Sequence, residues 1–168
     1  MKIVHGALFI LSVARFSLWR ESLGGGYMGV TITATNSMLR FDMGYGGFFN
    51  LRKNIAYALD KQLGDLYACL PRVAGNESAC EEYDRRVNAY LKRSGLGDKY
   101  EDVIDFLYSS DCGGEVSYKT CGRIFEIIKN VNFEGKCFRY AAYAHNDYDE
   151  FKRFLRDCYA RKRKMRWF

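Results

Sequence analysis

Residues 30–43 read VTITATNSMLRFDM, and their apolar and polar side chains alternate with a period of two. The apolar positions on either side of Asn36-Ser37 are Val30, Ile32, Ala34, Leu39, Phe41 and Met43. This alternation predicts two strands that each bury one face. Asn and Ser between the two runs favour a tight turn, so we expect a β-hairpin.

Beyond the hairpin the spacing of apolar residues becomes helical. Gly44-Tyr45-Gly46-Gly47 breaks the alternation and is interpreted as a tight strand-to-helix turn that needs positive φ. Helices are expected over 47–59, 62–70, 80–91 and 100–108, after the cap Ser117, and over 147–165, whereas 138–144 is ambiguous between helix and strand. The predicted fold class is α+β: an N-terminal β-hairpin followed by a mostly helical single domain, 28–168, of about five to six helices.

The composition limits the class of protein further. The chain of 168 residues is 48% hydrophobic and 16% aromatic and has a single proline, which argues against a disordered or low-complexity chain. No apolar run reaches the roughly 20 residues that a membrane-spanning helix needs. We therefore expect a globular chain of one domain that does not cross a membrane.

Residues 1–27 differ in composition from the rest and are treated as an N-terminal extension. Their apolar run is followed by Arg15 and Trp19, where a signal peptide would need small residues for cleavage. A helix lying on a membrane surface is a second possibility. We prefer a disordered extension or an upstream mistranslation with Met28 as the natural start, because codons for Leu23-Gly24-Gly25 can spell a bacterial ribosome-binding sequence.

Positive charge is concentrated at the C-terminal end. Residues 151–168 hold eight basic side chains and one acidic side chain, whereas residues 28–150 hold 15 basic and 18 acidic ones. We expect an anionic partner, either DNA or RNA or an acidic protein, to bind a C-terminal helix and tail. The candidate binding residues are Arg153, Arg156, Arg161, Lys162, Arg163, Lys164, Arg166 and Trp167. Interspersed Tyr159, Trp167 and Phe168 are suited to stacking on bases. The alternative is a solvated basic helix face that frays into a solvated tail.

Signals for a cofactor, a metal or catalysis are weak. No two of the six cysteines have the Cys-x-x-Cys spacing, so we expect reduced thiols, and Cys69, Cys80, Cys121 and Cys158 fall on apolar helix faces. Residues 109–120 resemble a calcium-binding loop around Gly114 but lack its first carboxylate and its closing Glu, so we interpret them as a helix connector. We expect no cofactor and no metal.

An enzymatic alternative stays open on two features. His145 could act as a base for a Cys nucleophile or together with an Asp. The Gly44–Gly47 turn could instead cradle a phosphate in a nucleotide-binding protein, although it lacks the Gly-Lys-Ser/Thr ending of a P-loop.

Three stretches carry a resemblance: 42–48 (DMGYGGF) followed by Leu51-Arg52, 110–115 (SDCGGE) with Cys121, and 141–147 (AAYAHND). Together they resemble small accessory proteins encoded by phages and prophages of Gram-positive gut bacteria (Firmicutes), over about 28–168. The resemblance implies a phage protein acting in the host cytoplasm. The function we expect is that of a non-enzymatic, anti-defence inhibitor, such as an anti-CRISPR protein, which binds a host defence effector or its nucleic acid. Such relatives often have Asp-Cys-Asp-Gly where this chain has Asp111-Cys112-Gly113-Gly114, which weakens a metal role.

Overall fold

Four strands form one antiparallel sheet in the computed structural model, which describes residues 29–70, 76–138 and 147–168. They are β1 (Gly29–Ala34), β2 (Phe41–Gly44), β3 (Gly114–Val116) and β4 (Met165–Trp167), in the order β2-β1-β4-β3. The predicted hairpin is confirmed, since Val30 lies opposite Met43 and Ile32 opposite Phe41. β3 and β4 extend the sheet beyond the prediction.

The sheet has one buried face and one open face. The buried side chains are Val30, Ile32, Ala34, Phe41, Met43, Met165 and Trp167. On the open face Glu115 lies opposite Arg166, which lies opposite Thr33, and all three are exposed or half-buried. Because side chains alternate along a strand, this pattern means that the helices cover only one side of the sheet.

Seven helices lie in the described part of the chain, slightly more than predicted. They are α2 (Tyr45–Leu59), α3 (Lys61–Ala68), α5 (Glu77–Ser94), α6 (Leu96–Lys99), α7 (Glu101–Tyr108), α8 (Tyr118–Ile128) and α9 (Asp147–Ala160). The additional helix is α6, a single turn that begins after Gly95 ends α5 at φ +70°. The predicted cap at Ser117 is confirmed, because its side chain accepts a hydrogen bond from the Thr120 amide. The α+β class is therefore the observed one.

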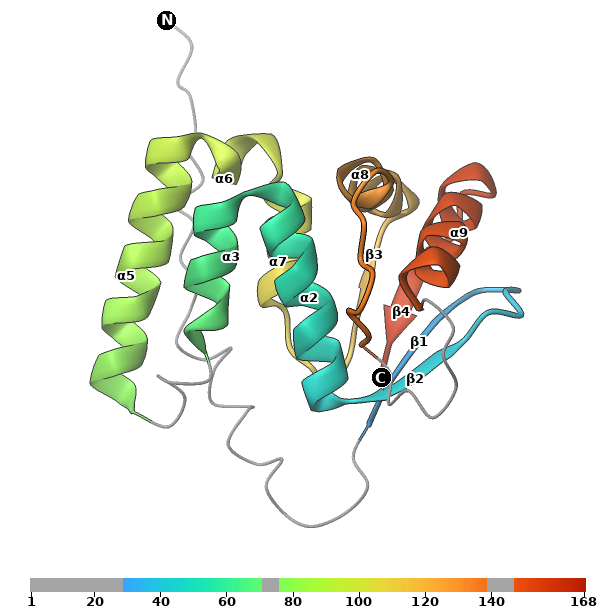
Figure 1. Cartoon of the computed structure of the whole chain (residues 1–168), viewed down its shortest axis with the longest axis horizontal. Coiled ribbons are helices and arrows are strands. Elements are labelled where there is room, and N and C mark those ends of the chain that lie inside the picture. Colours follow the sequence, from blue (N-terminus) through green and yellow to red (C-terminus); the bar gives the residue numbers. More distant parts are fainter. Residues whose placement is uncertain (1–28, 71–75, 139–146) are drawn as a thin grey trace, which may run out of the picture.

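The helices form two groups around α2 (Figure 1). α8 and α9 pack against each other beside the sheet, whereas α3, α5 and α6 lie on the far side of α2, and α7 contacts both α2 and α8. Phe41 of β2 makes edge-to-face contacts with Phe151 and Phe154 of α9, at ring-centroid distances of 5.7 and 5.4 Å. Buried side chains from both groups join in one hydrophobic core, so α9 and the sheet are fixed relative to the rest.

The glycine turn between β2 and α2 differs from its prediction. Gly44 has φ −71°, and α2 begins directly at Tyr45, so the turn does not need positive φ. In the described residues, positive φ among glycines occurs at Gly95, Gly113 and Gly135. Gly47 is required for another reason: a Cβ there would lie 2.0 Å from the carbonyl oxygen of Phe138. Close approach of two backbone segments, rather than a strained turn, explains this glycine.

Some expectations fall outside the described residues. The N-terminal extension 1–27 and nearly all of the ambiguous segment 138–144 belong to this group. Among the residues that are described, no helix combines the length and the apolar character needed to cross a membrane.

Candidate nucleic-acid interface

Helix α9 is amphipathic, and its polar face is basic. Tyr148, Phe151, Phe154, Leu155 and Cys158 are buried against the core. Asp147, Asp149 and Glu150 stand in the first turn, where carboxylates interact favourably with the helix dipole. The cations follow later in the helix, and Arg153 and Arg156 are exposed on its outer side. The sequence therefore separates the charges along α9, with the positive end next to β4.

The helix ends at Ala160, five residues before the predicted end at 165, in a hydrogen-bonded turn. The Lys162 amide donates to the Tyr159 carbonyl, and the Arg163 amide donates to the Cys158 carbonyl. Lys162 has φ +53°, in the left-handed region. This pattern is a Schellman motif, in which the left-handed position is usually glycine. A lysine therefore occupies a strained position at the centre of the basic segment.

Two carboxylates hold four of the cations. Asp157 binds Arg161 at 2.6 Å and Arg163 at 3.2 Å, and Glu115 of β3 binds Lys164 and Arg166 on the open face of the sheet. The hydrogen bond from Lys164 is the main cause that lowers the pKa of Glu115. Each carboxylate serves two cations, so the paired set still carries an excess of positive charge.

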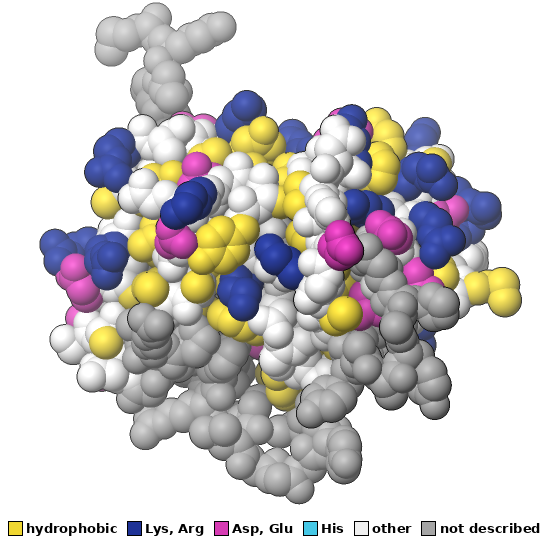
Figure 2. All heavy atoms as spheres, viewed as in Figure 1, with side chains coloured by type: hydrophobic (Ala, Val, Ile, Leu, Met, Phe, Trp, Pro, Cys, Tyr) yellow, Lys and Arg dark blue, Asp and Glu magenta, His cyan; other side chains and the backbone are white. Residues whose placement is uncertain are grey.

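Three exposed cations of the segment take part in no ion pair among the described residues: Arg153, Arg156 and Lys162. We call these three residues, together with the paired Arg161, Arg163, Lys164 and Arg166, the basic strip. Figure 2 shows dark blue side chains gathered over α9, at the end of the molecule opposite α5. The strip thus continues from the outer side of α9, through the turn, to the open face of the sheet.

The structure corrects the prediction for Trp167. This residue is only 3% exposed, and its indole Nε1 donates to the Ser110 carbonyl at 2.8 Å. Its ring packs against Phe106 and Phe48, with centroid distances of 5.6 and 6.0 Å. Met165–Trp167 is a strand of the sheet and not a frayed tail, so Trp167 is not available for stacking on a base. The exposed aromatic residues of the segment are Tyr159 and Phe168.

Asp111 has a structural partner that the sequence did not indicate. Its carboxylate accepts a hydrogen bond of 2.8 Å from Arg52 of α2, and both side chains are buried. Burial raises the pKa of Asp111, and the Arg52 charge acts in the opposite direction. The guanidinium also binds the carbonyls of Ser109 and Ser110 and lies 3.8 Å from the centroid of the Phe48 ring. This ion pair ties the connector before β3 to α2.

The cysteines are all free thiols, as expected. Cys80, Cys121 and Cys158 are buried and Cys69 is partly buried, whereas Cys112 and Cys137 are exposed. In the described ranges no group of three or more His, Cys, Asp or Glu side chains could hold a metal ion. His145, the proposed base of the enzymatic alternative, lies outside those ranges.

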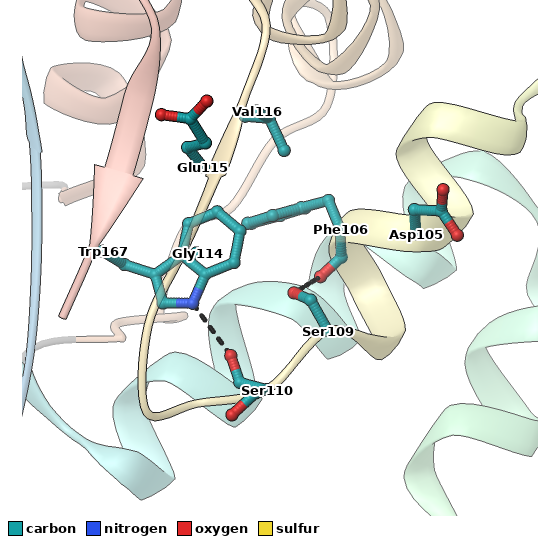
Figure 3. Close-up of a pocket in the computed structure, with 8 residues that line it drawn as sticks. All are labelled: Asp105, Phe106, Ser109, Ser110, Gly114, Glu115, Val116 and Trp167. Atoms are coloured by element: carbon teal, nitrogen blue, oxygen red, sulfur yellow. Dashed lines mark hydrogen bonds between the residues drawn. The ribbon is translucent and has the colours of Figure 1, made fainter. Parts of the chain in front are cut away.

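A pocket of about 290 Å³ opens between the end of α7, β3 and Trp167 (Figure 3). The polar groups that line it already have partners within the protein. Ser109 Oγ donates to the Phe106 carbonyl, the indole binds Ser110, and Glu115 binds two cations. The polar groups around the pocket are therefore engaged in hydrogen bonds and ion pairs within the protein, and the residues that line the pocket do not form a nucleophile and base pair.

Comparisons of the chain with protein-family models, with curated proteins and with solved structures found no match.

Proposed function

We propose that the chain is a non-enzymatic binding protein that engages nucleic acid through the basic strip of α9, the following turn and β4. The observation that carries the proposal is the set of three exposed cations without ion-pair partners among the described residues, Arg153, Arg156 and Lys162. Phosphate contacts by such side chains release counterions and supply most of the affinity of sequence-independent binding.

Two further features support the proposal. The backbone that carries the strip is anchored, since α9 is packed in the core and β4 pairs with both β1 and β3. Lys162 keeps a left-handed conformation in which a non-glycine residue costs about 1 kcal/mol or more. The strained position of this cation supports a role in binding, since strained residues cluster at functional sites.

The biological setting we propose follows from the resemblance to phage accessory proteins. In that setting the chain acts in the cytoplasm of the host bacterium and inhibits a defence system, such as a CRISPR effector, by binding the effector's nucleic acid. An acidic surface of the effector itself is the competing partner, and binding measurements distinguish the two.

The proposal is tested with two variants that lose the same charge at opposite ends of the molecule. One carries Arg153→Ala, Arg156→Ala and Lys162→Ala. The matched control carries Arg86→Ala, Lys92→Ala and Arg93→Ala, three exposed cations of α5. Binding to fluorescein-labelled single-stranded and duplex DNA is followed by anisotropy at about 50 mM salt, where phosphate contacts are strong.

We expect the α9 variant to bind at least tenfold more weakly than the wild type, because each lost phosphate contact removes released counterions. The α5 control should lose much less affinity, because its lost charges act on the DNA only through the long-range field of the protein. Equal losses of affinity in both variants would mean that binding depends on net charge alone, which would contradict a defined interface on α9. Absence of wild-type binding at low salt would favour an acidic protein as the partner and overturn the nucleic-acid proposal.

A further inference from the structure

Tyr159 is an exposed aromatic ring fixed against the neighbouring helix. A Cβ on Gly122 of α8 would lie only 2.6 Å from Cδ2 of the Tyr159 ring, so the ring rests directly on the glycine. The Tyr118 ring, one helical turn before Gly122, lies 6.3 Å away between centroids and is tilted by 32°. Tyr159 nevertheless stays 55% exposed. α8 thus holds the ring in place, and more than half of the residue is accessible.

Arg156 and Lys162, which form no ion pair among the described residues, lie on either side of Tyr159 in the sequence. Arg156 precedes Tyr159 by three positions on α9, a spacing that places both on the same side of a helix. Lys162 follows in the turn and is tied to Tyr159 by its amide hydrogen bond of 3.2 Å. Asp157, the carboxylate nearest in sequence, already binds Arg161 and Arg163. An accessible ring between two available cations combines a base-stacking surface with phosphate contacts.

Phe168 has similar exposure but a different setting. It is 62% exposed, and its backbone pairs with Thr31 on the open face of the sheet. The two arginines of that face are engaged with carboxylates: Arg166 binds Glu115, and Arg40 binds Asp42 at 2.9 Å. The Phe168 ring therefore lies beside cations that are already paired with carboxylates, which makes Phe168 a matched control for Tyr159.

We infer that the strip binds single-stranded nucleic acid and that a base stacks on Tyr159 while Arg156 and Lys162 contact the flanking phosphates. This inference rests on the proposed function and names its ligand class. In a duplex the base faces are stacked on one another and are closed to Tyr159, so the strip would read only the phosphates of a duplex. A single strand exposes its base faces to Tyr159 and its phosphates to Arg156 and Lys162.

The experiment compares three variants with the wild type. Tyr159→Leu keeps an apolar side chain over Gly122 but removes the ring, Tyr159→Phe keeps the ring, and Phe168→Leu removes the control ring. Circular dichroism verifies that each variant is folded. Affinity is measured for a fluorescein-labelled oligothymidylate of about twelve nucleotides, a length typical of single-strand sites, and for a duplex of equal length.

We expect Tyr159→Leu to weaken binding to the single strand by about fivefold or more, the low end of measured base-aromatic stacking. Duplex binding should change less than twofold, and Tyr159→Phe and Phe168→Leu should bind the single strand like the wild type. A loss below about threefold in Tyr159→Leu, or an equal loss in Phe168→Leu, overturns the stacking inference. If the triple α9 variant is still weakened, the proposed function stands, whereas a wild type that binds neither DNA overturns both.

Discussion

Replacing Lys162 by glycine should make the protein more stable and a weaker binder. Lys162 has φ +53° at the left-handed position of the turn after α9. That conformation costs a non-glycine residue about 1–2 kcal/mol. Glycine removes this strain but gains conformational freedom in the unfolded chain, which costs about 0.4–1 kcal/mol. The middle values of these two ranges give a free energy of unfolding for Lys162→Gly that is higher by about 0.8 kcal/mol.

The matched variant Lys162→Ala separates the backbone from the charge. Alanine keeps the left-handed strain and removes the cation, so we expect a stability close to that of the wild type. Both variants should lose affinity for single-stranded DNA, and the slope of log K against log salt should become shallower by about 0.7, the value for one phosphate contact. Binding thus falls in both variants, whereas stability rises only in the glycine variant.

Urea unfolding followed by circular dichroism measures the stability, and fluorescence anisotropy measures the binding. For a chain of this size a gain of about 1 kcal/mol also raises the melting temperature by about 2–4 °C. Equal stabilities of the glycine and alanine variants would refute the strain argument. Wild-type affinity and salt dependence in both variants would refute a role for Lys162 in binding.

Four further substitutions test buried charges and close backbone packing. Asp111→Ala leaves the buried Arg52 guanidinium without its counter-charge, so the free energy of unfolding measured in urea should fall by about 3–5 kcal/mol. A fall of less than about 1 kcal/mol would contradict the pairing of these two residues. Burial raises the pKa of Asp84 to about 6, and neither carboxylate oxygen has a hydrogen-bond partner among the described residues. Asp84→Asn should therefore raise the free energy of unfolding at pH 7 by about 1–3 kcal/mol. Because the folded-state pKa is the higher one, wild-type stability should rise as the pH falls through 6, and a flat wild-type profile between pH 7.5 and 5 would disprove this shift. A Cβ at Gly46 would meet open space, so Gly46→Ala should stabilise the protein by about 0.5–1 kcal/mol. A Cβ at Gly47 would lie 2.0 Å from a carbonyl oxygen, so Gly47→Ala should destabilise the protein by about 1–3 kcal/mol. A higher melting temperature for Gly47→Ala than for Gly46→Ala would exclude the close approach.

Local sequence signals predicted the elements that local interactions determine. The alternation in 30–43 identifies β1 and β2, because a half-buried strand imposes a period of two. Ser117 marks the start of α8, because its side chain caps the amide of a residue three positions later. The helix expected over 80–91 is α5, which ends before Gly95, a residue in the left-handed conformation of a C-cap.

The elements that were missed depend on contacts between distant residues. β4 has three residues and follows a run of cations, so its sequence resembles a solvated tail until β1 and β3 pair with it. Arg52 and Asp111 are separated by 59 positions, and nothing in the spacing of either residue indicates the other. Short strands and long-range ion pairs are fixed by tertiary context, which a single sequence does not display.

The candidate site was predicted as a set of residues but not as a surface. The basic composition of 151–168 identifies the cations, because charge can be counted in the sequence. Their pairing with Asp157 and Glu115, and the absence of pairing for Lys162 in the described residues, depend on three-dimensional placement. The sequence indicates Tyr159 as a residue suited to stacking on bases, but the exposure of its ring and its contact with Gly122 of α8 depend on three-dimensional placement.

The central claim is that Arg153, Arg156 and Lys162 contact phosphates of a nucleic acid. The most direct test is the salt dependence of binding to single-stranded DNA, measured from about 50 to 200 mM salt for the wild type and for the triple alanine variant. The account predicts a steep wild-type slope of log K against log salt and a variant slope that is shallower by about 2, equivalent to three lost phosphate contacts on a single strand. Parallel slopes for the two proteins would contradict it.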